Sequence, residues 1–137
     1  MIVKPVGSRD KVGEFFEARE FDCRCGRCLE TRIDPALVER LDALRRLAGP
    51  LIITSGFRCA AHQAALRGRG FETARGTSQH ELGRAADLVS RRHAPVEVEA
   101  LARQVGFTAV GLAPTFIHVD LRPQRIAWAY AKSRSKV

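Results

Sequence analysis

Two short apolar runs each carry ionisable side chains where a protein core does not tolerate them without a partner. The first is Ala85-Ala86-Asp87-Leu88-Val89, and the second is Phe116-Ile117-His118-Val119-Asp120. A carboxylate between apolar neighbours carries a desolvation penalty unless a cation neutralises it. A metal ion meets that need at Asp87, and a buried salt bridge to one of the many arginines is the alternative.

The second run has the alternation of a half-buried strand. Side chains with a period of two point to opposite faces, so Ile117, Val119 and Leu121 share one face. The other face carries Phe116, His118, Asp120 and Arg122. His118 and Asp120 are therefore predicted to project from the same side of the sheet.

His80 completes a ligand set with Asp87 and His118. The position four residues after His80 is Arg84, which excludes the helical motif with two histidines on one face. The segment instead predicts a turn at Gly83 that enters a strand. Two imidazoles and one carboxylate leave zinc an open coordination position, which is typical of a catalytic site. A hydrolase is the first hypothesis.

Three segments carry a family resemblance, namely Ile53-Thr-Ser-Gly-Phe-Arg-Cys59, Ser78-x-His-x-x-Gly-x-Ala-x-Asp87 and Phe116-Ile-His-Val-Asp-Leu-Arg122. From about residue 15 to 122 the chain resembles the zinc peptidases that include D-alanyl-D-alanine carboxypeptidases. This group also holds L-alanyl-D-glutamate endopeptidases and other murein peptidases, with the hedgehog domain as a structural relative. The resemblance implies that His80, Asp87 and His118 bind zinc. It also implies that Arg58 holds a carboxylate of the substrate, a task for which its planar guanidinium is well suited.

The general base is the point at which the chain departs from the family. Many members have an acid three residues before the last zinc histidine, where this chain has Thr115. Asp120 is the candidate base, although it could instead only orient a zinc ligand. Glu81 is the alternative base.

Polar residues beside the first ligand are candidates for contacts with substrate. Ser78 and Gln79 are predicted to bind substrate, although Ser78 could equally cap a turn. Away from this motif, His62 is interpreted as structural and His93 as a surface residue.

The chain is predicted to be one α+β domain over residues 1–137, with a catalytic core at about 15–122 and a basic tail at about 132–137. A small, mainly antiparallel sheet carries the zinc site, and helices pack on its other face. The predicted elements are a helix after Asp34-Pro35 that ends at Gly49 with Leu37, Leu41, Leu44 and Leu47 on one stripe, a buried strand at Pro50–Ser55, a short helix after Cys59, a polar loop at Arg67–Thr77, a helix at Pro95–Val105, a strand at Val110–Leu112 and a terminal helix at Pro123–Ala131.

Four cysteines form a second group of candidate ligands. Cys23, Cys25 and Cys28 lie close together, and Cys59 follows Arg58. A structural zinc ion, disulfides and free thiols all remain open, because the spacing is less regular than paired Cys-x-x-Cys knuckles and the redox compartment decides between them.

Composition bears on partners and location. The chain has 137 residues, 45% hydrophobic content and a net charge of +8. No run of about 18 apolar residues and no secretory signal is evident, which predicts synthesis in the cytoplasm and action on the cell wall after release or export. A phage or prophage endolysin is in this position, since it has to reach the cell wall after synthesis in the cytoplasm.

We expect a monomer that acts on peptidoglycan stem peptides. No nucleic-acid partner is expected, because the chain lacks interleaved aromatic and basic residues that would stack bases. The alternative is a non-catalytic zinc-binding domain that binds the cell wall or another polyanion.

Overall fold

A computed structural model describes residues 1–70 and 78–130 of the chain. Its helices and strands are β1 (Ile2–Pro5), the 3-10 helix η1 (Ala18–Phe21), β2 (Glu30–Ile33), α1 (Pro35–Ala48), β3 (Leu51–Ser55), α2 (Ala60–Gly68), β4 (Ala85–Ser90), α3 (Pro95–Gln104), β5 (Ala109–Leu112), β6 (Ile117–Asp120) and β7 (Ile126–Ala129).

The long helix α1 has the predicted boundaries. The Asp34 side chain accepts a backbone hydrogen bond in the first turn, Pro35 is the first helical residue, and Gly49 follows the last turn with φ of 80°. The predicted stripe is wrong at its last position, because Leu47 is 47% exposed. At 3.6 residues per turn, Ala48 takes that place instead. The buried residues on this stripe are Leu37, Leu41, Leu44 and Ala48.

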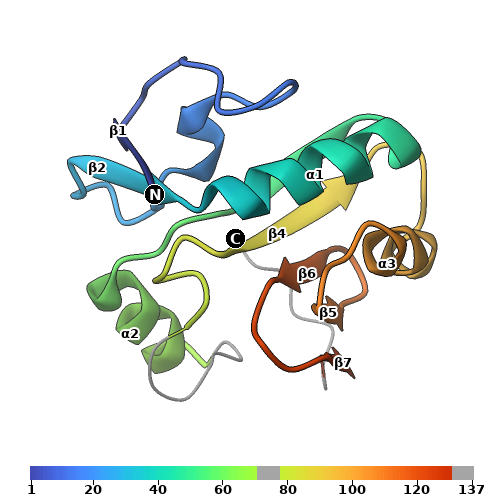
Figure 1. Cartoon of the computed structure of the whole chain (residues 1–137). Coiled ribbons are helices and arrows are strands. Elements are labelled where there is room, and N and C mark those ends of the chain that lie inside the picture. Colours follow the sequence, from blue (N-terminus) through green and yellow to red (C-terminus); the bar gives the residue numbers. More distant parts are fainter. Residues whose placement is uncertain (71–77, 131–137) are drawn as a thin grey trace.

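Five strands form the main sheet, in the order β3-β4-β6-β5-β7. The pairs β3-β4, β4-β6 and β6-β5 are antiparallel, whereas β7 runs parallel to β5. Strands β1 and β2 form a separate antiparallel pair, which lies beside η1 at one end of the molecule (Figure 1). The predicted α+β fold with a mainly antiparallel sheet is confirmed.

One face of the sheet feeds the hydrophobic core. Ile53 of β3, Leu88 of β4, and Ile117 and Val119 of β6 are buried in one cluster with residues of α1 and α3. Because alternate side chains point to opposite faces, Asp87 and His118 lie on the other face. Figure 1 shows α1 running along the sheet and α3 beside its far end. The predicted packing of helices on the face opposite the site is confirmed for α1 and α3, whereas α2 contributes no residue to this core.

The terminal helix predicted at Pro123–Ala131 is wrong, because Ile126–Ala129 forms β7. The Ile126 N–H donates to the Thr108 carbonyl, and the Tyr130 N–H donates to the Leu112 carbonyl. These bonds satisfy the edge of β5, which a helix would leave unpaired. Local preference after the proline is outweighed by this pairing.

Helix α2 begins after Cys59, as predicted, but it extends to Gly68 and so takes the first residues of the expected polar loop. Residues 71–77 of that loop lie outside the described residues, as does the basic tail. Within the described ranges, none of the helices has the length and the apolar run that a membrane crossing needs.

Candidate metal centre

The register of two neighbouring strands brings Asp87 and His118 together. They are direct cross-strand partners in the pair β4-β6. Both side chains project from the face away from the core, and Asp87 is 0% exposed while His118 is 5% exposed. Two ligand candidates from distant parts of the sequence thus meet through backbone pairing alone.

His80 reaches the same point from the turn before β4. Gly83 has φ of 69°, and its carbonyl accepts a hydrogen bond from the N–H of Asp34. A Cβ atom at Gly83 would lie 2.5 Å from the carbonyl oxygen of Arg32. The predicted turn at Gly83 is confirmed, and only glycine fits it without strain.

The turn also holds two polar residues of the motif. The Ser78 hydroxyl accepts from the N–H of His80 at 3.2 Å, and the Glu81 carboxylate accepts from the N–H of Ser78 at 2.6 Å. Ser78 is therefore used in capping the turn. Gln79 has its side-chain oxygen buried and without a hydrogen-bond partner among the described residues. The predicted contacts of Ser78 and Gln79 with substrate stay predictions.

The three candidate ligand atoms form a compact triangle. His80 Nε2 lies 3.2 Å from His118 Nδ1 and 3.3 Å from Asp87 Oδ1, and His118 Nδ1 lies 2.9 Å from Asp87 Oδ1. Tetrahedral zinc with ligands at about 2.0–2.1 Å needs ligand atoms about 3.3 Å apart. The triangle therefore fits one face of a zinc tetrahedron and leaves the fourth corner for another group.

Hydrogen bonds on the far side of each imidazole set which nitrogen is available. The Nδ1 atom of His80 lies 2.7 Å from the carbonyl oxygen of Gly56, and Nε2 of His118 lies 2.7 Å from Asp120 Oδ2. Each of these acceptors requires a proton on the nitrogen that faces it, so in the neutral ring the opposite nitrogen carries the lone pair. Both free lone pairs point into the triangle.

The two imidazoles differ in basicity. Burial lowers the pKa of His80 to about 4. Burial also disfavours the charged form of His118, but hydrogen bonds that its ring donates to the carboxylates of Asp120 and Asp87 outweigh burial and raise its pKa. Burial thus favours the neutral form of His80, which is the form that binds metal, whereas the two neighbouring carboxylates favour the charged form of His118.

Arg58 lies behind Asp87. Its Nη2 donates to Asp87 Oδ2 at 2.8 Å, its Nε donates to Ser55, and its Nη1 donates to Gln63. Arg58 is 2% exposed. The buried salt bridge weighed from sequence is therefore present at one oxygen of Asp87, while the other oxygen belongs to the triangle of candidate ligand atoms. The substrate-binding role of Arg58 stays a prediction, and this geometry favours a positioning role.

Asp120 is buried behind His118, opposite the triangle. Arg122 donates to both of its carboxylate oxygens at 2.5 to 3.1 Å. Burial favours the neutral acid, but hydrogen bonds from His118 and Arg122 outweigh it and hold the pKa of Asp120 well below its usual range. These contacts favour the ligand-orienting role over the role of general base.

Two further residues shape the wall beside His118. The ring of Trp128 in β7 lies 5.2 Å from the His118 ring, and the Arg122 guanidinium lies 5.0 Å from the Trp128 ring. Gly111 makes this approach possible, since a Cβ atom there would lie 2.6 Å from Trp128. Sequence analysis placed Trp128 in a terminal helix and so did not predict its contact with His118. The alternation of the strand did place Arg122 on the same face as Asp120.

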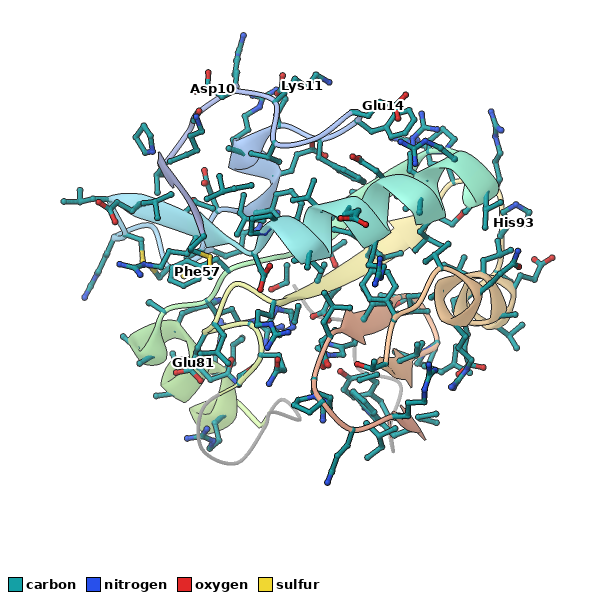
Figure 2. The ribbon with its side chains drawn as sticks, in the orientation of Figure 1. Asp10, Lys11, Glu14, Phe57, Glu81 and His93 are labelled. Atoms are coloured by element: carbon teal, nitrogen blue, oxygen red, sulfur yellow. The ribbon has the colours of Figure 1, made fainter. Side chains whose placement is uncertain are left out.

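The other histidines lie outside the triangle. His62 follows Cys59 in α2 and is half-buried, as a structural residue would be. His93 lies beside α3, away from Glu81 and Phe57 on the α2 side of the molecule (Figure 2). Thr115 is exposed.

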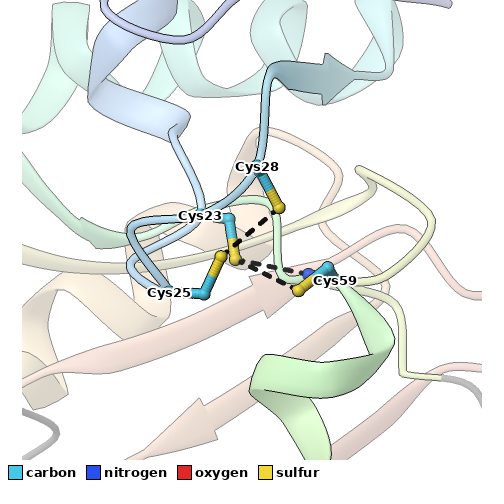
Figure 3. A group of neighbouring side chains, drawn as sticks. All are labelled: Cys23, Cys25, Cys28 and Cys59. Atoms are coloured by element: carbon cyan, nitrogen blue, oxygen red, sulfur yellow. Dashed lines mark hydrogen bonds between the residues drawn. The ribbon is translucent and has the colours of Figure 1, made fainter.

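The four cysteines form a second compact group, shown in Figure 3. All four are free thiols in the structure. Their sulfur atoms lie within 4.8 Å of one another. The described residues therefore include two groups of side chains that could hold a metal ion, one with His and Asp and the other with thiols.

The fold thus carries a buried His-Asp-His triangle that could hold a metal ion. The model of the Peptidase M15 family matches residues 14–120. Since that match covers more than half of the chain, the chain belongs to the Peptidase M15 family, and the resemblance seen in the sequence motifs is confirmed. A comparison with curated proteins finds none that matches this chain.

Proposed function

We propose that this chain is a zinc-dependent peptidase that cleaves the peptide part of peptidoglycan. The bond would lie in the stem peptide or cross-link that contains D-amino acids, as in a phage or prophage endolysin that reaches the wall after release or export. The observation that carries the proposal is the buried triangle of His80, Asp87 and His118 in a chain of the Peptidase M15 family.

The residues around the triangle suit hydrolysis. A zinc ion bound by these three residues would supply a Lewis acid able to polarise the scissile carbonyl and to lower the pKa of water to about 7. Two neutral imidazoles and one carboxylate neutralise only part of the charge of the ion. Gly56 and Asp120 accept hydrogen bonds from the outer nitrogens of the two histidines, so the opposite nitrogens would face the ion, and Arg58 holds the second oxygen of Asp87.

The base is the open part of this mechanism. Asp120 is engaged by His118 and Arg122, so Glu81 becomes the stronger candidate. Glu81 belongs to the turn that carries His80, and one of its oxygens accepts from the N–H of Ser78. Comparing Glu81→Gln with Asp120→Asn in peptide hydrolysis at full zinc occupancy separates the two. A fully active Glu81→Gln protein would remove this assignment.

The decisive experiment is digestion of purified murein by the zinc-loaded protein, with the released termini identified by mass spectrometry. We expect new peptide termini that disappear with a chelator and return with added zinc. His118→Ala is the matched inactive variant, because it removes one ligand from the triangle. Zinc bound in the triangle without any released fragment or free amino acid would contradict the proposal.

A second candidate is a non-catalytic zinc domain that binds the cell wall or another polyanion. Thr115, in the place of the family's acid, is exposed and has no useful basicity, which favours this candidate. The net charge of +8 suits an anionic surface. Co-sedimentation with murein that weakens with salt, in the absence of cleavage, would support it.

A further inference from the structure

One short segment connects the two groups of candidate ligands. The Gly56 carbonyl lies 2.7 Å from His80 Nδ1, and Arg58 donates to Asp87. The next residue, Cys59, belongs to the group of thiols. Residues 55–59 therefore support the His-Asp-His triangle from one end and carry a cysteine at the other.

The segment is pressed against the N-terminal part of the chain. The Phe57 N–H donates to the Phe21 carbonyl at 2.8 Å, and a Cβ atom at Gly56 would lie 2.7 Å from the Phe21 Cα. Phe21 ends η1, and Cys23 follows two residues later. The cysteines thus join two segments far apart in sequence at the place where they touch.

The distances between the thiols suit a metal ion and do not suit disulfides. Cys23 Sγ lies 3.8 Å from Cys59 Sγ, and Cys25 Sγ lies 3.4 Å from Cys28 Sγ (Figure 3). A disulfide needs about 2.05 Å between sulfurs. Tetrahedral zinc with sulfur ligands at about 2.3 Å needs sulfurs about 3.8 Å apart.

Backbone amides are arranged to stabilise thiolates. The Arg27 N–H donates to Cys25 Sγ at 3.3 Å, the His62 N–H donates to Cys59 Sγ at 3.4 Å, and the Cys59 N–H donates to Cys23 Sγ at 3.4 Å. Cys59 is also the N-cap of α2, where the helix dipole favours negative charge. Gly26, with φ of 76°, makes the turn between Cys25 and Cys28.

The local charge balances such a site. Four thiolates exceed the charge of a divalent ion by two negative charges. Arg24 and Arg27, both exposed, alternate with the cysteines in Cys23-Arg24-Cys25-Gly26-Arg27-Cys28. They offset that excess without entering the group of thiols.

We propose that Cys23, Cys25, Cys28 and Cys59 bind a second, structural zinc ion that holds residues 55–59 in place and thereby positions His80 and Asp87. Four protein ligands close the coordination sphere, as in structural zinc sites. This site does not depend on peptidase activity, so it stands or falls separately from the proposed function.

The first test uses the reduced full-length protein loaded with Co²⁺ in place of zinc. We expect thiolate-to-cobalt charge-transfer absorption in the near ultraviolet from the wild-type chain, because the His-Asp-His triangle contains no sulfur. The absorption should persist in His80→Ala/His118→Ala and disappear in Cys25→Ser/Cys28→Ser. A wild-type chain that takes up Co²⁺ without this absorption would overturn the proposal.

Because the cysteine variant could fail to fold, a second measurement uses the wild-type protein alone. With zinc bound, the thiols should resist a thiol reagent, and a chelator should make all four react under native conditions. An organomercurial should release one zinc ion per chain as these thiols are titrated, also in His80→Ala/His118→Ala. Thiols that react equally fast with and without zinc would contradict the site.

The coupling to the triangle has its own test. In Cys28→Ser we expect the triangle's affinity for zinc to fall about tenfold or more, as when outer-shell support is lost. Leu29→Ser is the matched control, because Leu29 is 84% exposed and adjacent in sequence. If Cys28→Ser loses its thiolate-bound ion but keeps wild-type affinity at the triangle, the positioning role is refuted.

Discussion

At the scale of single residues, the hydrogen bonds behind the ligands decide what the metal centre can do. Gly56 and Asp120 each hold a proton on the far nitrogen of a histidine, and Arg58 holds the far oxygen of Asp87. These partners keep each ligand in one orientation. The ligand types follow from the motif, but their usable atoms follow from these outer contacts.

Asp120 should act mainly through His118. In Asp120→Ala we expect zinc affinity to fall about 10- to 100-fold, because Nε2–H of His118 loses its acceptor. Asp120→Asn keeps an acceptor oxygen and should lose less. Competition with a chromophoric chelator measures both affinities.

Asp10→Asn is the control for that series, since Asp10 lies in the N-terminal region, away from the five-stranded sheet (Figure 2). Wild-type zinc affinity in Asp120→Ala would contradict the orienting role. An Asp120→Asn protein that binds zinc normally but has lost hydrolysis would restore Asp120 as the base.

Arg58 should matter most when the triangle holds no ion. Removing one partner of a buried ion pair costs about 3–5 kcal/mol, because the other charge is left without compensation. We expect Arg58→Met to show this loss with a chelator and a smaller loss with zinc, which itself neutralises Asp87. Urea unfolding of wild type and variant in both conditions measures it. Equal losses in the two conditions would show that Arg58 does not compensate Asp87.

At the scale of elements, strand register builds the centre. Ser55, Asp87, His118, Gly111 and Trp128 are successive cross-strand partners across the sheet. A slip of one residue in β6 would turn His118 into the core and Val119 toward the ligands. The apolar pattern of β4 and β6 therefore fixes the register on which both the core and the site depend.

The turn at Gly83 should be the most sensitive loop position. Gly83→Ala forces a side chain into the left-handed region, at a cost of about 1–2 kcal/mol, and also into the Arg32 carbonyl. We expect lower stability in urea unfolding and weaker zinc binding, because the turn carries His80. Gly68→Ala is the control, since a Cβ atom there meets nothing within 4 Å. A Gly83→Ala protein as stable as the control would contradict this reading of the turn.

Strand β7 shows how an edge can override local preference. Pro123 and the residues after it favour a helix start, yet Ile126–Ala129 pairs with β5 in parallel. The gain is backbone hydrogen bonding along β5 and contact of Trp128 with His118. Because β7 has only four residues, its sequence carries no periodic pattern that would predict its pairing with the distant strand β5.

At the scale of the whole molecule, the hydrophobic core and the polar centre occupy opposite faces of one sheet. Helices α1 and α3 contribute to the core on one face, while α2 begins at the candidate ligand Cys59 and the turn before β4 carries the candidate ligand His80. The polar face buries several charged side chains, which is costly unless each is paired. Metal ions would complete that pairing, so stability and metal binding should be coupled.

Zinc should therefore raise the melting temperature. A ligand that binds only the folded state stabilises it by about 2.7 kcal/mol at 100 times its dissociation constant. We expect two increments in wild type as zinc is titrated into the metal-free protein, and one in His80→Ala/His118→Ala. Differential scanning calorimetry measures them. A melting temperature that zinc does not change would contradict the coupling.

The sequence by itself determined the ligand types, the helix caps of α1, the turn at Gly83 and the alternation of β6. These follow from backbone geometry and side-chain chemistry over a few residues, so a short window contains the whole cause. The family motif extended this to the class of enzyme.

Only the tertiary structure decided which nitrogen of each histidine is free, that Arg58 bonds Asp87, that Asp120 supports His118, and that Cys59 meets the other cysteines. Each of these depends on the register and packing of segments tens of residues apart. Many such pairings satisfy the same local rules, and burial of charge, together with the unpaired edge of β5, selects among them.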